Sequence, residues 1–375
     1  MSVIIGADIV PIPSNMSLFE SDNTEDLIGK ELCGIISAAD YRIFNLEVPL
    51  TDSLSPIEKY GPVLAASSKS IIGLKAIGVD LFTLANNHIM DQDAQGLEST
   101  IQLLNEYKIS HVGAGNCISE ASKPFYFTVK EKRYGVYSCA EHEFSIAAKN
   151  KPGANPFDPL ESPDHVKEMK SKCDYAIVLY HGGKEQYRYP SPNLQQICRK
   201  LVDKGADLVI CQHSHCIGCK EEYKNKTIVY GQGNFHFAKR SNEFWDSGLL
   251  ICIDETENIT YIPVLKSGHT IRMANKEESD EILAGFEHRS GEITRDGFVE
   301  SNYKIFADEM LPEYILYFLD ASNNLVFRVV NKLSGQRLRK HIIKCIKTKR
   351  GLGITNYIEC EAHRELLLKG LESKK

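Results

Sequence analysis

The sequence lacks an apolar run long enough to cross a membrane. A spanning helix needs about 18 to 20 consecutive apolar residues, and no stretch of the 375 residues approaches that length. The first ten residues, MSVIIGADIV, have no basic flank, and their apolar run is shorter than the core of a signal peptide. We therefore expect a cytoplasmic protein that meets a membrane only peripherally, at its inner face.

The sequence also lacks an excess of positive charge and a cysteine framework. A formal net charge of -6 at pH 7 argues against a protein that coats nucleic acid, because phosphate backbones attract basic surfaces. The 11 cysteines are an odd number without framework spacing, which indicates reduced thiols. With 42% hydrophobic and 25% charged residues, the chain has the balance of a globular protein with a sizeable core.

No internal repeat and no low-complexity tract interrupts the chain, but its character changes near Ser267. Short apolar segments give way there to a longer, charged, helical pattern, so we predict an α/β domain over 1–266 and a mainly helical extension over 267–375. Between Lys332 and Arg350 the extension holds eight Lys or Arg and no acidic residue. This run is either a solvated basic helix face, which is the simpler interpretation, or a contact with an anionic lipid surface or polymer.

Two histidines follow the clearest strand of the α/β domain. The segment from Ala206 to Cys211 is short and mostly apolar, and His213 and His215 come directly after it. In an extended segment residues i and i+2 point to the same side, so both imidazoles would face one spot beyond the carboxyl end of the strand. Open α/β sheets bind ligands at that place. The pair is therefore half of a metal site or, alternatively, a surface pair without a ligand.

Other predicted strands also end in polar side chains. The strand from Tyr41 to Leu46 leads to Glu47, a carboxylate among apolar neighbours that requires a partner. Asp8 ends the strand that begins at Val3, where an aspartate is equally typical of a turn. The ligand-type residues collected from the strand ends are Asp8, Glu47, Asn87, His88, His181, His213 and His215. This mixture of carboxylate, amide and imidazole groups suits one or two divalent ions, with Mn, Fe or Zn favoured over Mg.

One strand end also offers a proton donor. His88 follows the strand that reaches Leu84, and Asp91 lies three residues later, where its carboxylate can orient the imidazole ring. Hydrolysis needs a group that protonates the leaving atom, and histidine is the commonest such group. We therefore assign His88 as a general acid, oriented by Asp91.

A different metal site competes for the two histidines. Cys216 and Cys219 form a C-x-x-C pair directly after His215, a spacing that zinc knuckles and redox motifs share. Because the chain has no second C-x-x-C, a structural zinc ion would need His213 or His215 as well. A chance pair of buried thiols is the simpler interpretation.

Seven motifs, in the right order along the chain, resemble those of the CapA family of capsule and poly-γ-glutamate synthesis proteins. They are GADIVPIPSN (6–15), NLEVPLTD (45–52), ANNHIMD (85–91), EHEFS (141–145), HGGKEQYRYPSP (181–192), GADLVICQHSHCIG (205–218) and IVYGQGNFHF (228–237). The resemblance extends from about residue 2 to 265, and roughly the last hundred residues lie outside it. It implies a calcineurin-like metallophosphoesterase fold, a four-layer α/β/β/α sandwich of two mixed sheets flanked by helices, with metal ions at the strand ends.

The resemblance also implies which residues hold the metal ions. One ion would take Glu47, Asn87, His181 and His213, and the other would take Asp8, Glu47 and His215. Metallophosphoesterases typically begin with Asp-x-His, whereas Ile9 and Val10 follow the aspartate here, and Gln212 stands in the place of a motif glycine. The second ion would therefore have too few ligands unless Glu141, Glu143 or Glu185 completes its ligand set.

We therefore expect a metal-dependent hydrolase that acts on a phosphoester or an amide in the biosynthesis of capsule polysaccharide or poly-γ-glutamate. Its substrate would be a capsule-type polymer or a phosphorylated or amide precursor. The side chains expected near that substrate are Asn45, Glu141, Glu143, Glu185, Arg188 and Asn234. The alternative is a non-catalytic protein that holds the polymer within a synthesis or export complex. The 332–350 segment would contact a synthase or the membrane.

Overall fold

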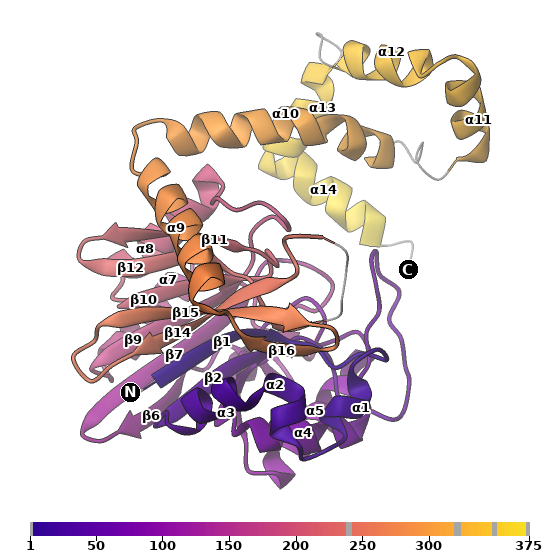
Figure 1. The fold of residues 1–375 in the computed structure, drawn as a ribbon. Coiled ribbons are helices and arrows are strands. Elements are labelled where there is room, and N and C mark those ends of the chain that lie inside the picture. Colours follow the sequence, from indigo (N-terminus) through magenta and orange to yellow (C-terminus); the bar gives the residue numbers. More distant parts are fainter. Residues whose placement is uncertain (1–2, 238–241, 319–323, 347–350, 373–375) are drawn as a thin grey trace. The chain divides into compact units, whose positions relative to one another are not determined.

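The computed structural model describes residues 3–237, 242–318, 324–346 and 351–372 (Figure 1). The first of its sheets is mixed and is built around β1 (Val3–Ile9). On one side of β1 the strands β2 (Tyr41–Leu46), β3 (Leu81–Thr83) and β4 (Ser110–Val112) follow in parallel, and β13 (Asn234–His236) also pairs with β1 in parallel. On the other side the antiparallel strands are β14 (Ser247–Ile253), β15 (Ile259–Ser267) and β16 (Thr270–Met273).

The second sheet has a parallel centre and antiparallel edges. Its strands, in spatial order, are β11 (Ile217–Tyr223), β12 (Lys226–Gln232), β10 (Leu208–Gln212), β9 (Tyr175–His181), β7 (Lys132–Ala140) and β6 (Phe125–Val129). The four central strands run parallel, while β11 and β6 pair in antiparallel fashion with their neighbours. A separate short pair joins β5 (Ala114–Gly115) to β8 (Gly153–Ala154).

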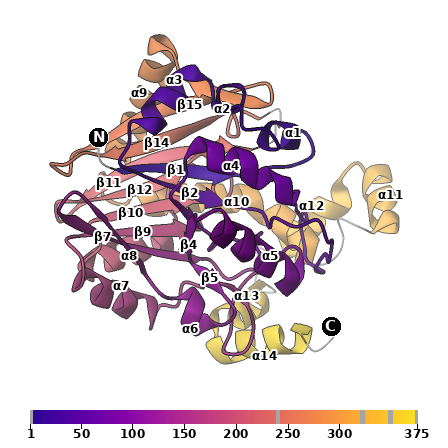
Figure 2. The ribbon, with the colours of Figure 1, turned by 90° about the horizontal axis from the view of Figure 1, so that it is seen from below.

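Helices cover the outer face of each sheet, as Figures 1 and 2 show. The first sheet is covered by α1 (Met16–Phe19), α2 (Thr24–Ile28), α3 (Lys30–Ser37), α4 (Ile71–Ile77) and α5 (Asp93–Glu106), with the 3-10 turn η1 (Ser68–Ser70) before α4. The second sheet is covered by α7 (Ser162–Lys170) and α8 (Pro192–Asp203), while α6 (Ile118–Ala121) follows β5. Separate apolar clusters fill the space between the two sheets and the space under each helical layer. The predicted four-layer sandwich of two mixed sheets is confirmed.

Strand β1 shows why these segments are apolar throughout rather than alternating. Successive side chains of a strand point to opposite faces of the sheet. Val3 and Ile5 accordingly lie in the cluster between the sheets, whereas Ile4 lies in the cluster under the helices. Because both faces of the central strands are buried, both sets of positions must be apolar, and polar residues become informative only where the strands end.

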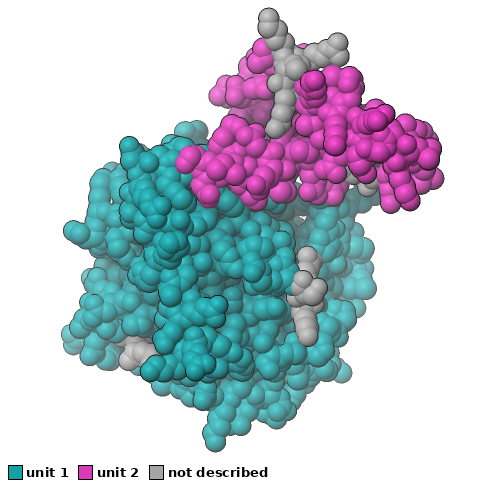
Figure 3. Space-filling view, turned by 45° about the horizontal axis from the view of Figure 1, so that its top comes forward, with its two compact units in different colours: residues 1–300 teal, residues 301–375 magenta. Residues whose placement is uncertain are grey.

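The larger compact unit of the chain extends further than the predicted domain boundary near residue 267. The two compact units are 1–300 and 301–375, which Figure 3 colours separately. Strand β16 pairs with β15, and α9 (Lys276–Glu292) buries Phe286 in the cluster between the sheets. The guanidinium of Arg289 also donates to the backbone carbonyls of Gly218 and Ile217. The charged exposed faces of α9 produce the change in composition, while its few buried residues keep it within the first unit.

The second compact unit consists of helices, in agreement with the predicted helical extension. Helix α10 (Phe298–Phe318) leads into it, and α11 (Leu325–Leu333), α12 (Arg337–Ile346), α13 (Gly351–Glu359) and α14 (Glu361–Glu372) follow. Of the basic 332–350 segment, residues 347–350 lie outside the described part of the chain. Within the described part, none of the helices combines the length and apolar character that crossing a membrane requires.

Candidate metal centre

The candidate site lies where parallel strands of both sheets end. In the first sheet Asp8 of β1 is in register with Asn45 of β2 and with Asn234 of β13. In the second sheet His181 of β9 is in register with Gln212 of β10. Parallel pairing thus aligns the polar residues that follow each apolar strand. The two sheets meet at this edge, since Asn45 Nδ2 lies 3.4 Å from His181 Nδ1.

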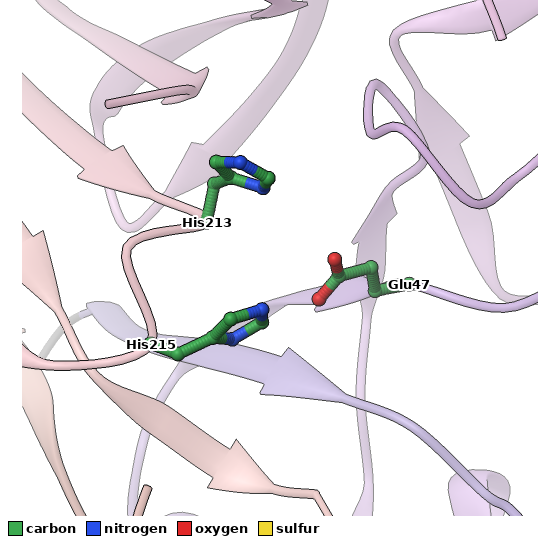
Figure 4. Close-up of side chains that lie close together, drawn as sticks. All are labelled: Glu47, His213 and His215. Atoms are coloured by element: carbon green, nitrogen blue, oxygen red, sulfur yellow. The ribbon is translucent and has the colours of Figure 1, made fainter. Parts of the chain in front are cut away.

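His213 and His215 reach this edge in a conformation that differs from the predicted extended one. Strand β10 ends at Gln212, and both histidines have a positive φ, 82° for His213 and 53° for His215. Such left-handed backbone costs a non-glycine residue about 1–3 kcal/mol and persists only where the surroundings enforce it. Both rings nevertheless converge, because their ligand atoms and a carboxylate oxygen of Glu47 lie within 4.8 Å of one another. Figure 4 shows the carboxylate of Glu47 pointing toward the two rings.

Two glutamines hold the turn that contains His213 and His215 against the first sheet, and sequence reasoning missed this role. The amide of Gln212 donates to the carbonyl of Gly6 at 3.1 Å and to Oε1 of Gln232 at 3.1 Å. The amide of Gln232 donates in turn to the carbonyls of Ile5 and Leu249. These buried bonds join the two sheets directly beside the site. They explain what a glutamine does at position 212, where the family motif has glycine.

The atoms of one predicted ion position surround Nε2 of His181. Asn87 Oδ1 lies 3.1 Å away, His213 Nδ1 lies 3.2 Å away and Glu47 Oε1 lies 3.3 Å away. Burial lowers the pKa of His181, and burial together with the neighbouring imidazoles holds the pKa of His213 well below its usual range. Both rings are therefore neutral at physiological pH, the state in which imidazole binds a metal ion.

The second group contains the two carboxylates. Asp8 accepts a hydrogen bond from Asn45 Nδ2 at 2.8 Å, and its other oxygen lies 3.7 Å from His215 Nδ1. Burial raises the pKa of Glu47 to about 7, and burial together with the charge of Glu47 raises the pKa of Asp8 to about 8. Among the described residues, both oxygens of Glu47 and one oxygen of Asp8 are buried without a hydrogen-bond partner.

These unpartnered oxygens test whether the site fits a divalent cation. A buried polar group without a hydrogen bond destabilises a fold, and a buried charge does so far more unless it is paired. Here three such oxygens face buried imidazole nitrogens and the amide oxygen of Asn87 within one buried site. Carboxylate, amide and imidazole groups are the ligands that Mn, Fe and Zn accept. The residues present therefore fit a divalent metal ion, which would neutralise the carboxylates and occupy the nitrogen lone pairs.

A buried network extends from the site through His88. Its Nδ1 lies 2.6 Å from Oδ2 of Asp91, and the same carboxylate accepts a bond from the backbone of Leu64 at 2.7 Å. The ammonium of Lys59 is paired with the other oxygen of Asp91 and donates to the carbonyl of Asn87 at 3.2 Å. The predicted His88–Asp91 contact is thus present in the structure. The contribution of Lys59 was missed, because a lysine in a loop gives no local signal of what it reaches.

The side chains predicted to contact substrate fall into two groups. Three of them are engaged in holding the site together. Asn45 bonds Asp8, Asn234 Oδ1 lies 2.8 Å from His215 Nδ1, and Arg188 donates to the carbonyl of Ile217 at 2.9 Å. Such contacts orient ligands and loops rather than leave the side chain available to a substrate.

The second group consists of three glutamates around the rim of the candidate metal centre. Glu141 accepts a bond from the backbone of Gly183 at 3.1 Å, and burial raises the pKa of its carboxyl. Glu143 Oε1 is 3.9 Å from His213 Nε2 and is partly exposed. Glu185 is partly buried, and its charge contributes to raising the pKa of Glu47. The rim is therefore acidic, which favours a cation or an amine over a bare polyanion.

An aromatic wall closes the side of the site at His215. The ring of Trp245 stacks on the imidazole with 4.1 Å between centroids and an interplanar angle of 24°, and Phe237 lies 5.3 Å away. Neither aromatic residue was predicted as part of the site. Stacking limits the orientations of the imidazole, so this wall presents His215 to the carboxylates in a fixed pose.

The C-x-x-C pair does not contribute to this site. Cys219 belongs to the apolar cluster between the second sheet and its helices, and Cys216 is fully buried. Burial raises the pKa of both thiols, which disfavours the thiolate form that binds zinc. Within the part of the chain that the structure describes, the group of three or more potential ligands with metal-site spacing is Glu47, His213 and His215. The interpretation of the cysteines as buried thiols agrees with this placement.

Comparison with known proteins gives a family match over residues 14–239, to the family described as "Bacterial capsule synthesis protein PGA_cap". The chain is 30% identical over 223 residues to "PGA biosynthesis protein CapA" of Bacillus subtilis (strain 168), covering 58% of this chain and 58% of that protein. It is 28% identical over 236 residues to "Capsule biosynthesis protein CapA" of Bacillus anthracis, covering 60% and 57%. The chain thus spans less than three fifths of the length of these relatives.

Two solved structures illustrate the likeness in three dimensions. A putative 5'-nucleotidase from Staphylococcus aureus aligns with a TM-score of 0.42 at 16% identity, covering 76% of this chain and 58% of that chain. A hypothetical protein from Thermus thermophilus aligns with a TM-score of 0.42 at 13% identity, covering 73% and 96%.

Proposed function

Because the chain belongs to the bacterial capsule synthesis protein family PGA_cap, we propose that it is a metal-dependent hydrolase of capsule or poly-γ-glutamate biosynthesis. The bond it cleaves is a phosphoester or an amide of the polymer or of its precursor. The observation that carries this proposal is the buried cluster in which unpartnered carboxylate oxygens of Glu47 and Asp8 face imidazole nitrogens, with a histidine–aspartate pair beside it. A purely structural core would gain nothing from burying these groups.

The ligand residues divide into two sets that share Glu47. One set is Asn87, His181, His213 and Glu47, and the other is Asp8, His215 and Glu47. Bound Mn, Fe or Zn would supply Lewis acidity toward the scissile group and an activated water at neutral pH. The chain's part is to place the two carboxylates where an ion would favour their ionised form, to keep the imidazoles of His181 and His213 neutral and to exclude bulk water by burial.

His88 protonates the leaving group in this proposal. Its Nδ1 donates to Asp91, so the proton available for transfer is the one on Nε2. Asp91 orients the ring, and Lys59 holds Asp91 in place through their buried ion pair. The same ammonium fixes the carbonyl of Asn87, so one residue aligns the proton donor with a metal ligand.

A second function is favoured by one specific feature, which is the lack of a histidine ligand close to Asp8 in the sequence. Val10 stands two residues after Asp8, where metallophosphoesterases carry a histidine, and it is buried in the apolar cluster under the helices. A site with a single complete ligand set suits a protein that uses one ion to hold an anionic polymer within a synthesis complex. In that role His88 and Asp91 would have no chemical task.

Metal-dependent turnover separates the two functions. The purified protein is loaded with Mn, Fe or Zn in turn and assayed with a chromogenic phosphodiester, a phosphomonoester and a poly-γ-glutamate fragment. We expect turnover of at least one substrate class that requires the metal and is slowed in His88→Asn. If the protein binds stoichiometric amounts of each of the three metals but turns over none of the three substrates, the polymer-binding function is supported instead.

A further inference from the structure

Helix α11 carries an apolar face that the described structure leaves uncovered. Leu325, Val326, Val329, Val330 and Leu333 recur at helical spacing and are between 45% and 82% exposed. At 100° per residue they span one side of the helix, and Arg328 and Lys332 flank this apolar face along one edge. Exposed apolar faces of this kind mark interaction surfaces, because water disfavours them.

Helix α12 adds positive charge next to this face. From residue 325 to 346 the two helices hold six basic residues and no acidic one. The six basic residues are Arg328, Lys332, Arg337, Arg339, Lys340 and Lys344. In α12 the aliphatic residues Leu338, Ile342 and Ile346 recur at helical spacing and are partly buried. Both helices are therefore basic and amphipathic.

The turn between the two helices is fixed by Asn331, the buried residue of α11. Its amide nitrogen donates to the side chain of Gln336 at 2.7 Å, and its side-chain oxygen accepts from the backbone of Arg339 at 3.0 Å. Its own carbonyl accepts from the backbone of Gln336 at 2.8 Å. The α11–α12 hairpin, residues 325–346, is thus held together by local bonds, so that both apolar stripes and both sets of basic residues belong to one structural element.

We propose that the α11–α12 hairpin docks on an anionic lipid bilayer. Apolar side chains would enter the boundary between headgroups and acyl chains, and the six basic residues would contact the lipid phosphates. With 9 and 10 residues the helices are too short to cross a bilayer, so they lie in its surface. A soluble polyanion would use the basic residues but would leave the apolar face of α11 in water. The combination of both therefore favours lipid.

The test is vesicle co-sedimentation of the full chain with phosphatidylcholine vesicles that contain either no phosphatidylglycerol or a large fraction of it. Three variants are compared with the wild type. Val326→Asp/Leu333→Asp removes the apolar contact at two exposed positions, and Arg339→Gln/Lys340→Gln/Lys344→Gln removes three charges. Leu160→Asp serves as control, since Leu160 is as exposed as Leu333 but lies in the first unit.

We expect binding to the anionic vesicles only, weakened by salt. The charge variant should bind about 100-fold more weakly, because each basic residue near an anionic surface contributes roughly fivefold. The apolar variant should lose roughly tenfold or more, and the control should bind as the wild type does. Circular dichroism and gel filtration of each variant show that the chain remains folded.

Three results would overturn the proposal. Equal binding to vesicles with and without phosphatidylglycerol would remove the role of the basic residues. Full vesicle binding by Val326→Asp/Leu333→Asp, with binding lost only in the charge variant, would indicate a polyanion surface, which a soluble poly-γ-glutamate fragment would then compete for. A change of oligomeric state in the apolar variant without lipid would show that a second copy covers the α11 face.

Discussion

Replacing Glu47 with glutamine separates the role of its charge from the role of its shape. Glu47 is fully buried, and burial raises the pKa of its carboxyl from 4.5 to about 7. Because the folded-state pKa lies above the unfolded value, the contribution of this group to stability is fully present below pH 4.5 and is lost as the pH rises through 7. Glutamine keeps the volume and never ionises, so metal-free Glu47→Gln should not show that loss.

The magnitude follows from the size of the shift. A change of one pKa unit corresponds to about 1.4 kcal/mol, so the raised pKa of Glu47 lowers the free energy of unfolding of the metal-free protein by about 3 kcal/mol at pH 8 and by about 1 kcal/mol at pH 5, relative to a side chain that does not ionise. The metal-free variant should therefore exceed the wild type in free energy of unfolding by these amounts. Added metal should reverse the order at both pH values, because an ion at 1,000 times its Kd stabilises the wild type by about 4.1 kcal/mol, more than the deficit at pH 8, and binds the variant poorly.

The assay is urea unfolding followed by circular dichroism, at pH 5 and pH 8, with chelator and with Mn. Glu98→Gln, on the exposed side of α5, is the matched control and should change little in any condition. A metal-free Glu47→Gln protein that is less stable than the wild type at pH 8 would refute the reasoning. So would a difference that does not grow between pH 5 and pH 8, since the charge of Glu47 would then not be the cause.

Three further outcomes are expected. His213→Ala should remove most of the bound metal while the fold remains intact, which elemental analysis and circular dichroism would show; unchanged metal stoichiometry would disprove the ligand assignment. His88→Asn should keep the metal and lower kcat by about 10²- to 10⁴-fold, and loss of metal instead would make His88 a ligand. A chain that ends after Glu300 should stay soluble and metal-loaded, whereas one that ends after Lys266 should not fold, because it lacks the buried Phe286 of α9. If the shorter chain folds and binds metal, α9 is dispensable for the core.

The strand ends could be predicted from the sequence because their signal is local. Each candidate ligand follows a short apolar run, as His181 follows Tyr175–Tyr180, and parallel pairing then aligns such ends without further information. The family resemblance supplied the order of the layers and the division of the ligands between two ions. The layer order agrees with the structure.

The remaining features depend on contacts between distant segments. Lys59 reaches Asp91 from a loop 32 residues earlier, and Gln212 reaches Gly6 across 206 residues. No periodicity or spacing marks such pairs. The turn at His213 was predicted as extended because periodicity does not reveal a positive φ in a non-glycine residue. The compact unit continues past residue 267 to residue 300, which composition does not reveal, because the charged exterior of α9 hides the few positions, such as Phe286, that it buries.

The aromatic wall makes intrinsic tryptophan fluorescence a probe of the candidate metal centre. Trp245 is the only tryptophan of the chain, and it stacks on His215 at the edge of the metal centre. Indole emission responds to charge and contacts in its immediate surroundings, so all tryptophan fluorescence of this protein arises beside one candidate ligand. An ion that captures His215 will change that emission, and a titration can follow it without a label. The α11–α12 hairpin contains no tryptophan, so this emission reports on the surroundings of His215 and not on residues of the hairpin.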